Sequence, residues 1–254
     1  LDVAVLPSDR LSVRFFAGDG TGRLREDIVV SLSGESSLPC VGLAVIRGSG
    51  TSGDGLVVAT APRLEHLEFS AESGVPVWRQ AIPLSYEEGR RDVEVGDFDG
   101  NGVPDVAVSS QDGEAVQIFL GSPQGGSILF DDGAKPILEL TQDGSAIEAS
   151  FRSPRALAAA DFDLDGTGRT DLAVLVVEAQ DPMLKLYVST GDGLTFRLQD
   201  QLAFGDAEID TGAALEALDG ASFERSDGEA IDPHPDLLLN RQSRVSKILV
   251  TGGA

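Results

Sequence analysis

Short apolar runs recur along the chain and are separated by turns rich in glycine, aspartate and serine. Five related runs begin at residues 2, 55, 105, 171 and 236, so successive starts differ by 53, 50, 66 and 65 residues. Apolar runs of about four to eight residues bounded by turn residues are typical of β-strands. Internal repeats with periods of about 20–50 residues or somewhat more are typical of solenoids and propellers. The pattern therefore predicts a repeated β-structure.

Each of these runs is followed by the same succession of further strands. The predicted second strands, with alternating polarity, are 11–15, 64–69, 116–119, 184–187 and 245–250. The predicted third strands are 27–30, 77–82, 137–140 and 196–202. Strands of small residues, which precede the next repeat, are predicted at 41–45, 93–95, 156–160 and 214–217. Four such strands form one antiparallel sheet, which buries both faces only when it stacks against other sheets.

The predicted fold is all-β, a β-propeller of four-stranded antiparallel blades. Residues 1–254 are expected to form a single partial propeller, with repeats at approximately 1–40, 41–91, 92–155, 156–213 and 214–254. The terminal repeats lack an inner and an outer strand respectively, which indicates roughly four and a half blades of a larger ring rather than a closed five-bladed one. The small-residue strands are expected to be innermost, where neighbouring blades converge.

Two acidic loops lie where a small-residue strand meets the next apolar run. In residues 97–105, side-chain oxygens fall at alternate positions and a glycine permits a sharp turn. The expected calcium ligands there are Asp97, Asp99, Asn101, the Val103 carbonyl and Asp105. Calcium prefers about six to eight oxygen ligands, and neither histidine nor cysteine is near this loop. The spacing therefore predicts a calcium site.

The second acidic loop, residues 161–171, fits this pattern in two registers. The first preserves every spacing and uses Asp163, Asp165, Thr167, the Arg169 carbonyl and Asp171. The second preserves the Asp-Phe dipeptide of the first loop and uses Asp161, Asp163 and Asp165, with two inserted residues before Asp171. The first register is preferred because no insertion is needed. In either register we expect a second calcium site.

Residues 97–108 resemble the calcium repeat of the FG-GAP/VCBS family, whose members include integrin-alpha-like β-propellers. The segment 56–62 with the strand at 64–69 is similar to another part of the same repeat. The resemblance implies a calcium-stabilised propeller that serves adhesion or the recognition of a protein or carbohydrate. It also implies an extracellular, cell-surface or periplasmic location. Such repeats also accompany catalytic domains, so fold alone does not determine function.

Composition narrows the classes of partner. The chain has 42 acidic and 19 basic residues, a formal net charge of −23. This balance argues against nucleic acid and anionic membranes as partners. No apolar run approaches the ~18 residues of a membrane span, so no membrane insertion is expected. The single Cys40 excludes an internal disulfide.

The sequence offers little for catalysis. Its histidines are His66 and His234, and it contains no Gly-x-Ser-x-Gly, Walker-type loop or zinc cluster. The expected function is therefore that of a non-catalytic calcium-binding propeller module for extracellular adhesion or for protein or glycan recognition. The alternative is the propeller accessory domain of a secreted hydrolase or lyase, with its catalytic residues outside this segment.

Overall fold

The computed structural model describes the strands, both acidic loops and most of the segment between them. The described residues are 3–5, 12–18, 21, 23–32, 42–46, 55–60, 63–69, 76–84, 92–110, 114–125, 127–131, 135–178, 181–203, 214–218, 236–241 and 244–248. Within these ranges the protein is all-β and contains no α-helix, which confirms the predicted class. Cys40 and His234 lie outside them.

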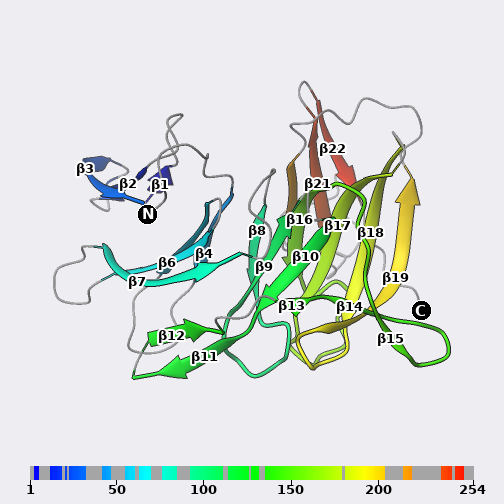
Figure 1. Ribbon diagram of the computed structural model, residues 1–254. Helices are drawn as coiled ribbons and strands as arrows, with labels where there is room; N and C mark the ends of the chain where they lie inside the picture. Colours follow the sequence, from blue (N-terminus) through cyan, green and yellow to red (C-terminus); the bar gives the residue numbers. More distant parts are fainter. Residues whose placement is uncertain are drawn as a thin grey trace.

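The strands form antiparallel sheets that follow one another in chain order (Figure 1). Sheet I contains β1 (Val3–Val5), β2 (Ser12–Gly18) and β3 (Leu24–Ser31). Sheet II contains β4 (Gly42–Ile46), β5 (Gly55–Ala59), β6 (Arg63–Phe69) and β7 (Pro76–Pro83). Sheet III contains β8 (Val93–Gly96), β9 (Asp105–Ser110), β10 (Ala115–Phe119) and β13 (Lys135–Pro136).

Two further sheets and a hairpin complete the described fold. Sheet IV contains β16 (Pro154–Ala160), β17 (Asp171–Glu178), β18 (Asp181–Ser189) and β19 (Thr195–Ala203), extended by β14 (Leu138–Leu140) and β15 (Ala146–Glu148). Sheet V contains β20 (Ala214–Leu218), β21 (Asp236–Arg241) and β22 (Arg244–Ile248). The hairpin pairs β11 (Gly121–Gln124) with β12 (Ser127–Phe130).

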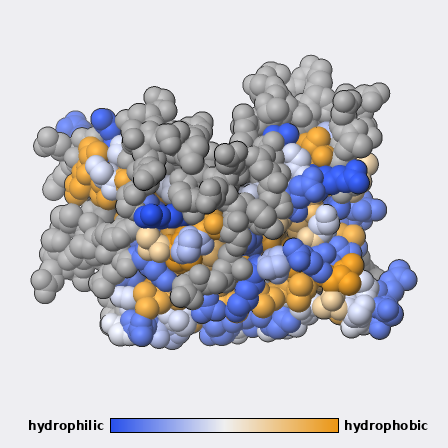
Figure 2. All heavy atoms as spheres, in the orientation of Figure 1, coloured by the Kyte–Doolittle hydropathy of each residue, from blue (hydrophilic) through white to orange (hydrophobic). Residues whose placement is uncertain are grey.

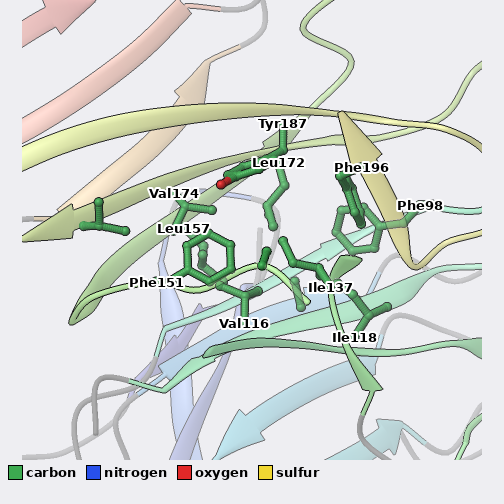
Figure 3. Packing of buried hydrophobic residues seen from close by; sticks show 13 residues of the cluster. Phe98, Val116, Ile118, Ile137, Phe151, Leu157, Leu172, Val174, Tyr187 and Phe196 are labelled. Atoms are coloured by element: carbon green, nitrogen blue, oxygen red, sulfur yellow. The ribbon is translucent and has the colours of Figure 1, made fainter. Parts of the chain in front are cut away.

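Apolar side chains fill the spaces between successive sheets. Val13 and Phe15 of sheet I pack with Leu56 and Leu67 of sheet II. A second cluster joins sheets II and III and includes Phe130 of the hairpin. The third cluster joins sheets III and IV. Figure 3 shows its aromatic pairs, Phe98 with Phe196 at a ring-centroid distance of 6.0 Å and Phe151 with Tyr187 at 5.6 Å. Each of these sheets is therefore held mainly by burial against its neighbours.

The strands of small residues lie where the sheets meet. β4 contacts β8, β8 contacts β16 and β16 contacts β20, so the first strands of sheets II to V form a succession. At Gly42 on β4, a Cβ atom would lie 2.7 Å from Val93 Cγ2 on β8, closer than a real Cβ approaches. Ala156 and Ala158 on β16 are almost fully buried. Small side chains thus allow the close approach that the sequence predicts.

Residues 135–140 do not form the single strand that was predicted over 137–140. They are divided between β13, which pairs with β10 in sheet III, and β14, which pairs in parallel with β19 in sheet IV. Ile137 lies at the crossing: its side chain is fully buried, and its N–H donates to the Val116 carbonyl at 3.1 Å. Leu138 N then donates to the Leu194 carbonyl at 2.7 Å. Burial of Ile137 between the sheets accounts for the transfer.

The surface mixes polar and apolar residues, and Figure 2 shows hydrophobic residues at the end of the molecule occupied by sheet I. Leu24, Ile28 and Val29 of β3 are among the exposed large hydrophobic side chains. None of the described residues belongs to a helix that is long and apolar enough to cross a membrane.

Gly42→Val should lower the free energy of unfolding by about 1–3 kcal/mol, because the added side chain overpacks the contact between β4 and β8. Val45→Thr is the control: Val45 lies on the same strand but is 54% exposed. Urea unfolding measures both variants. A Gly42→Val protein as stable as the wild type would show that close approach of these strands is not required.

Candidate metal sites

Loop A, residues 97–105, connects β8 to β9 within sheet III. It brings together the carboxylates of Asp97, Asp99 and Asp105, each of which offers an oxygen within 4.8 Å of the others. Asp105 is fully buried, and the other two are partly exposed. The structure thus gathers the three acidic side chains of the predicted first site on one side of a strand-to-strand turn.

Asp105 closes loop A because both of its oxygens accept hydrogen bonds from the backbone. Oδ2 accepts from Phe98 N at 2.9 Å, and Oδ1 accepts from Gly121 N at 2.7 Å. Phe98 is itself fully buried in the core between sheets III and IV. At Gly121, a Cβ atom would lie 2.1 Å from the Pro104 carbonyl oxygen, so only glycine allows this approach. The carboxylate therefore ties the loop to the start of the hairpin.

The turn of loop A is shaped by hydrogen bonds to the first two carboxylates. Asn101 N donates to Asp97 Oδ1 and to Asp99 Oδ1, both at 3.0 Å, and Gly102 N donates to Asp97 Oδ2 at 2.7 Å. Gly100 and Gly102 have φ angles of 75° and 80°, which favour glycine. Val103 N donates to Asn101 Oδ1 at 2.6 Å. The ligand role of the Val103 carbonyl stays a prediction.

Loop B, residues 161–171, connects β16 to β17 in sheet IV and repeats this arrangement. Asp161, Asp163 and Asp171 bring carboxylate oxygens within 4.8 Å of one another. Asp171 Oδ2 accepts from Phe162 N at 2.9 Å and from Asp163 N at 3.2 Å. Its Oδ1 accepts from Ser189 N at 2.9 Å. Asp171 thus closes loop B in the way that Asp105 closes loop A.

The backbone of loop B resembles that of loop A in both of the predicted registers. Leu164, Gly166 and Gly168 have φ angles of 49°, 73° and 75°. The first two correspond to Gly100 and Gly102 of loop A in the second register, and the last two correspond to them in the first. The local hydrogen bonds correspond as well. Asp165 N donates to Asp163 Oδ1 at 3.1 Å, and Thr167 N donates to Asp165 Oδ1 at 2.8 Å.

Whether an ion would use the preferred first register stays a prediction, and the three clustered carboxylates include Asp161 instead of Asp165. Asp165, which that register places second among the ligands, pairs instead with Arg169, whose Nη2 lies 2.7 Å from Asp165 Oδ2. Thr167 donates its hydroxyl proton to Asp165 and accepts from Arg169 Nε at 2.9 Å. Two features favour the second register: Phe162 is buried as Phe98 is, and its N–H donates to the closing aspartate in the same way.

Burial and mutual repulsion perturb the closing carboxylates. Burial raises the pKa of Asp105 to about 7; hydrogen bonds from Gly121 and Phe98 oppose this rise, and the charges of Asp99 and Asp97 add to it. Burial likewise raises the pKa of Asp171 to about 6, with a further contribution from Asp163. Hydrogen bonds from Thr167 lower the pKa of Asp165, and Arg169 adds to this. A cation among the clustered acids would relieve their repulsion.

The donor set suits a hard divalent cation. Each cluster offers carboxylate oxygens without histidine or cysteine, and calcium takes such oxygen ligands in flexible geometry. Both loops are also accessible. Loop A borders a cavity of about 270 Å³ lined in part by Asp97 and Val95, and loop B borders one of about 210 Å³ lined in part by Asp163 and Arg197. Each cavity thus adjoins at least one carboxylate of its loop.

Sequence reasoning missed the residues that support the loops. Gly121 and Ser189 donate to the closing carboxylates from 16 and 18 residues away. No local pattern marks these two residues as donors to a carboxylate, although each lies two positions after the end of a predicted second strand. The Asp-Phe dipeptide that both loops share was the one sequence signal for their common structure. In the structure both phenylalanines are buried beside the first carboxylate.

Comparison with known proteins supports the fold alone. No family model matches the chain, and no curated protein sequence matches it. It is similar to a functionally unknown protein from Desulfotomaculum acetoxidans, with a TM-score of 0.50, 13% identity and coverage of 97% of this chain and 61% of that one. The Tc holotoxin pore of Photorhabdus luminescens gives a TM-score of 0.47, 14% identity and coverage of 98% and 13%. The chain thus spans less than two thirds of either protein.

The metal-free fold should lose stability as the pH rises from about 4 to about 7. Asp105 and Asp171 have pKa values of about 7 and about 6 in the folded protein, against 3.8 ordinarily, so the folded state binds more protons across this window. Thermal unfolding in chelator between pH 4 and 8 measures the effect. An Asp105→Asn/Asp171→Asn variant should show a weaker pH dependence. A metal-free wild type at least as stable at pH 7 as at pH 5 would contradict the prediction.

Leu164→Gly should raise the free energy of unfolding by about 0.5 kcal/mol. Relief of a left-handed backbone, worth about 1–2 kcal/mol, exceeds the roughly 0.5–1 kcal/mol of backbone entropy that glycine adds. Leu164 is 37% exposed and belongs to none of the hydrophobic clusters between the described sheets, so the packing lost is limited. Leu202→Gly is the matched control: Leu202 is 47% exposed, lies in a strand and should be destabilised by the same change. A destabilised Leu164→Gly protein would show that this turn is not strained.

Proposed function

We propose that this chain is a non-catalytic, calcium-stabilised module of the β-propeller type, which recognises a protein or carbohydrate outside the cytoplasm. The observation that carries the proposal is the equivalence of loops A and B. They share the closing aspartate bound by two backbone segments, the buried phenylalanine and the three clustered carboxylates. Two copies of one arrangement in successive sheets are best explained by one ligand, and calcium fits the oxygen donors.

The order of the sheets supports a propeller arrangement. Sheets I to V follow the chain, and consecutive strands within each sheet pair antiparallel, apart from the additions of β13 to sheet III and of β14 and β15 to sheet IV. The first strands of sheets II to V contact one another in turn, as the inner strands of successive blades do. The parallel pairing of β14 with β19 gives sheet IV a strand from the preceding repeat. Because β13 pairs in sheet III, one short segment contributes strands to two neighbouring sheets.

Energetics favour a calcium-rich location. If each loop binds calcium with a dissociation constant of ~10⁻⁴ M, as extracellular modules do, ~10⁻³ M calcium adds ~1.4 kcal/mol per site. Two sites then contribute a sizeable share of a typical stability of about 5–15 kcal/mol. At submicromolar calcium the contribution is negligible. Calcium in these loops is therefore useful chiefly outside the cytoplasm.

Recognition of a protein or carbohydrate is the role that fits the rest of the molecule. The high negative charge argues against nucleic acid. The acidic groups that cluster within the described residues are accounted for by the two loops. A rigid stack of sheets that presents loops at the sheet ends is a common scaffold for binding.

Isothermal titration of calcium into chelator-treated protein tests the proposal. Two binding sites are expected in the wild type and none in Asp97→Ala/Asp163→Ala, since each change removes one carboxylate of a cluster. The matched control is Asp131→Ala/Asp200→Ala, which removes two exposed aspartates outside the loops and should retain both sites. No heat of binding at millimolar calcium in the wild type would refute the proposed function.

A further inference from the structure

Loops A and B belong to different sheets, yet a buried chain of hydrogen bonds joins their closing carboxylates. Ser189 N donates to Asp171 Oδ1 at 2.9 Å, and Ser189 Oγ donates to the Phe98 carbonyl at 2.6 Å. Phe98 N in turn donates to Asp105 Oδ2 at 2.9 Å. Ser189 is 3% exposed and Phe98 is fully buried. Movement of either closing carboxylate is therefore transmitted through Ser189 and Phe98 to the other.

A second connection joins Asp97, the first residue of loop A, to Thr170, which precedes the closing Asp171 of loop B. Asp97 N donates to Thr170 Oγ1 at 2.9 Å, and Thr170 N donates to the Asp97 carbonyl at 2.8 Å. The contact is close, because a Cβ atom at Gly96 would lie 2.5 Å from Thr170 Cγ2. These reciprocal bonds hold the backbone of loop A against the backbone of loop B.

Side-chain packing adds a third connection. At Gly100 in the turn of loop A, a Cβ atom would lie 2.9 Å from Arg169 Cγ, and Arg169 belongs to loop B. At Gly193, in the turn between β18 and β19, a Cβ atom would lie 3.0 Å from Asp99 Cβ. The turn of loop A is thus seated against two segments of sheet IV.

We infer that the two loops bind calcium with positive cooperativity, and that Ser189 and Thr170 are the positioning residues that couple them. The inference rests on the proposed calcium function. An ion in loop A fixes Asp97, Asp99 and Asp105, and through the contacts above it orders the backbone around Asp171. The second ion then binds a loop that is already ordered and loses less conformational entropy. By reciprocity, an ion in loop B raises the affinity of loop A equally.

Repulsion between two bound cations opposes this coupling, and salt separates the two effects. Screening acts over about 8 Å at 0.15 M salt and about 3 Å at 1 M, whereas hydrogen bonds between buried groups are little affected. Positive cooperativity should therefore persist or increase at high salt. Coupling that is purely electrostatic would be negative and would disappear.

Calcium titration of single-site variants measures the coupling. Asp99→Ala reports loop B alone and Asp163→Ala reports loop A alone, because alanine offers no oxygen to an ion. Neither side chain takes part in the hydrogen bonds that join the two loops. The wild-type constant for binding two ions should exceed the product of the two single-site constants by about fivefold or more, within the usual range of coupling energies. The same comparison at 1 M salt should give at least as large a factor.

Changing the connecting residues should remove this factor. In the Ser189→Ala/Thr170→Val double variant, the excess should fall to within about twofold of unity, and each single change should reduce it in part, while the single-site constants change less. The controls are Ser109→Ala and Thr60→Val. Ser109 and Thr60 are buried and use their hydroxyl groups in hydrogen bonds remote from both loops. They should retain the cooperativity even where they lower stability.

The outcomes separate the inference from the function on which it rests. Two calcium sites whose joint constant equals the product of the single-site constants would overturn the coupling and leave calcium binding intact. Cooperativity unchanged in both Ser189→Ala and Thr170→Val would overturn the assignment of these residues. No calcium binding at all would overturn both the coupling and the proposed function.

Discussion

A buried aspartate that binds two separate backbone segments is the interaction on which this structure depends. Asp105 holds Phe98 and Gly121, and Asp171 holds Phe162 and Ser189. In each case a carboxylate at the start of a central strand fastens the loop before it to the chain at the end of the following strand, β10 in sheet III and β18 in sheet IV. Burial disfavours the charge and raises the pKa of both groups. Each of these carboxyl groups is thus costly to ionise, and the backbone N–H groups compensate for that cost only in part.

Phe98, which donates to the buried Asp105, also belongs to the hydrophobic core between sheets III and IV. Phe98 follows the first carboxylate of loop A, and its ring packs on Phe196 of sheet IV at a centroid distance of 6.0 Å. Its peptide groups lie between Asp105 and Ser189. The hydrophobic cluster between sheets III and IV and the two acidic loops are therefore one structural unit. A cation that neutralises the loops would stabilise the junction between these sheets as well as the loops themselves.

Much of the local structure could be predicted from the sequence, because it is specified by nearby residues. Apolar runs such as 105–108 and 171–174 fall on β9 and β17, and the strands of small residues fall on β4, β8, β16 and β20. Asp97, Asp99 and Asp105 were expected together from their spacing and are close in the structure. In these places, alternating polarity and turn residues are sufficient signals.

What could not be predicted depends on contacts distant in the sequence. In loop B, the buried Phe162 donates to Asp171, and Asp161 lies with Asp163 and Asp171, whereas sequence spacing alone favoured Asp165. The transfer of β14 to sheet IV depends on where Ile137 is buried. The contacts of Ser189 and Thr170 with loop A join residues 91 and 73 positions apart. No periodic pattern encodes such pairs.

The central claim, that both acidic loops are calcium sites built on one plan, is tested most directly by a crystal structure determined in millimolar calcium with anomalous diffraction. The account predicts one calcium peak in each loop, within about 2.3–2.6 Å of oxygens from Asp97, Asp99 and Asp105 in loop A and from Asp161, Asp163 and Asp171 in loop B. Loops that contain only water under these conditions, or a calcium ion bound in loop B through Asp165 instead of Asp161, would contradict it.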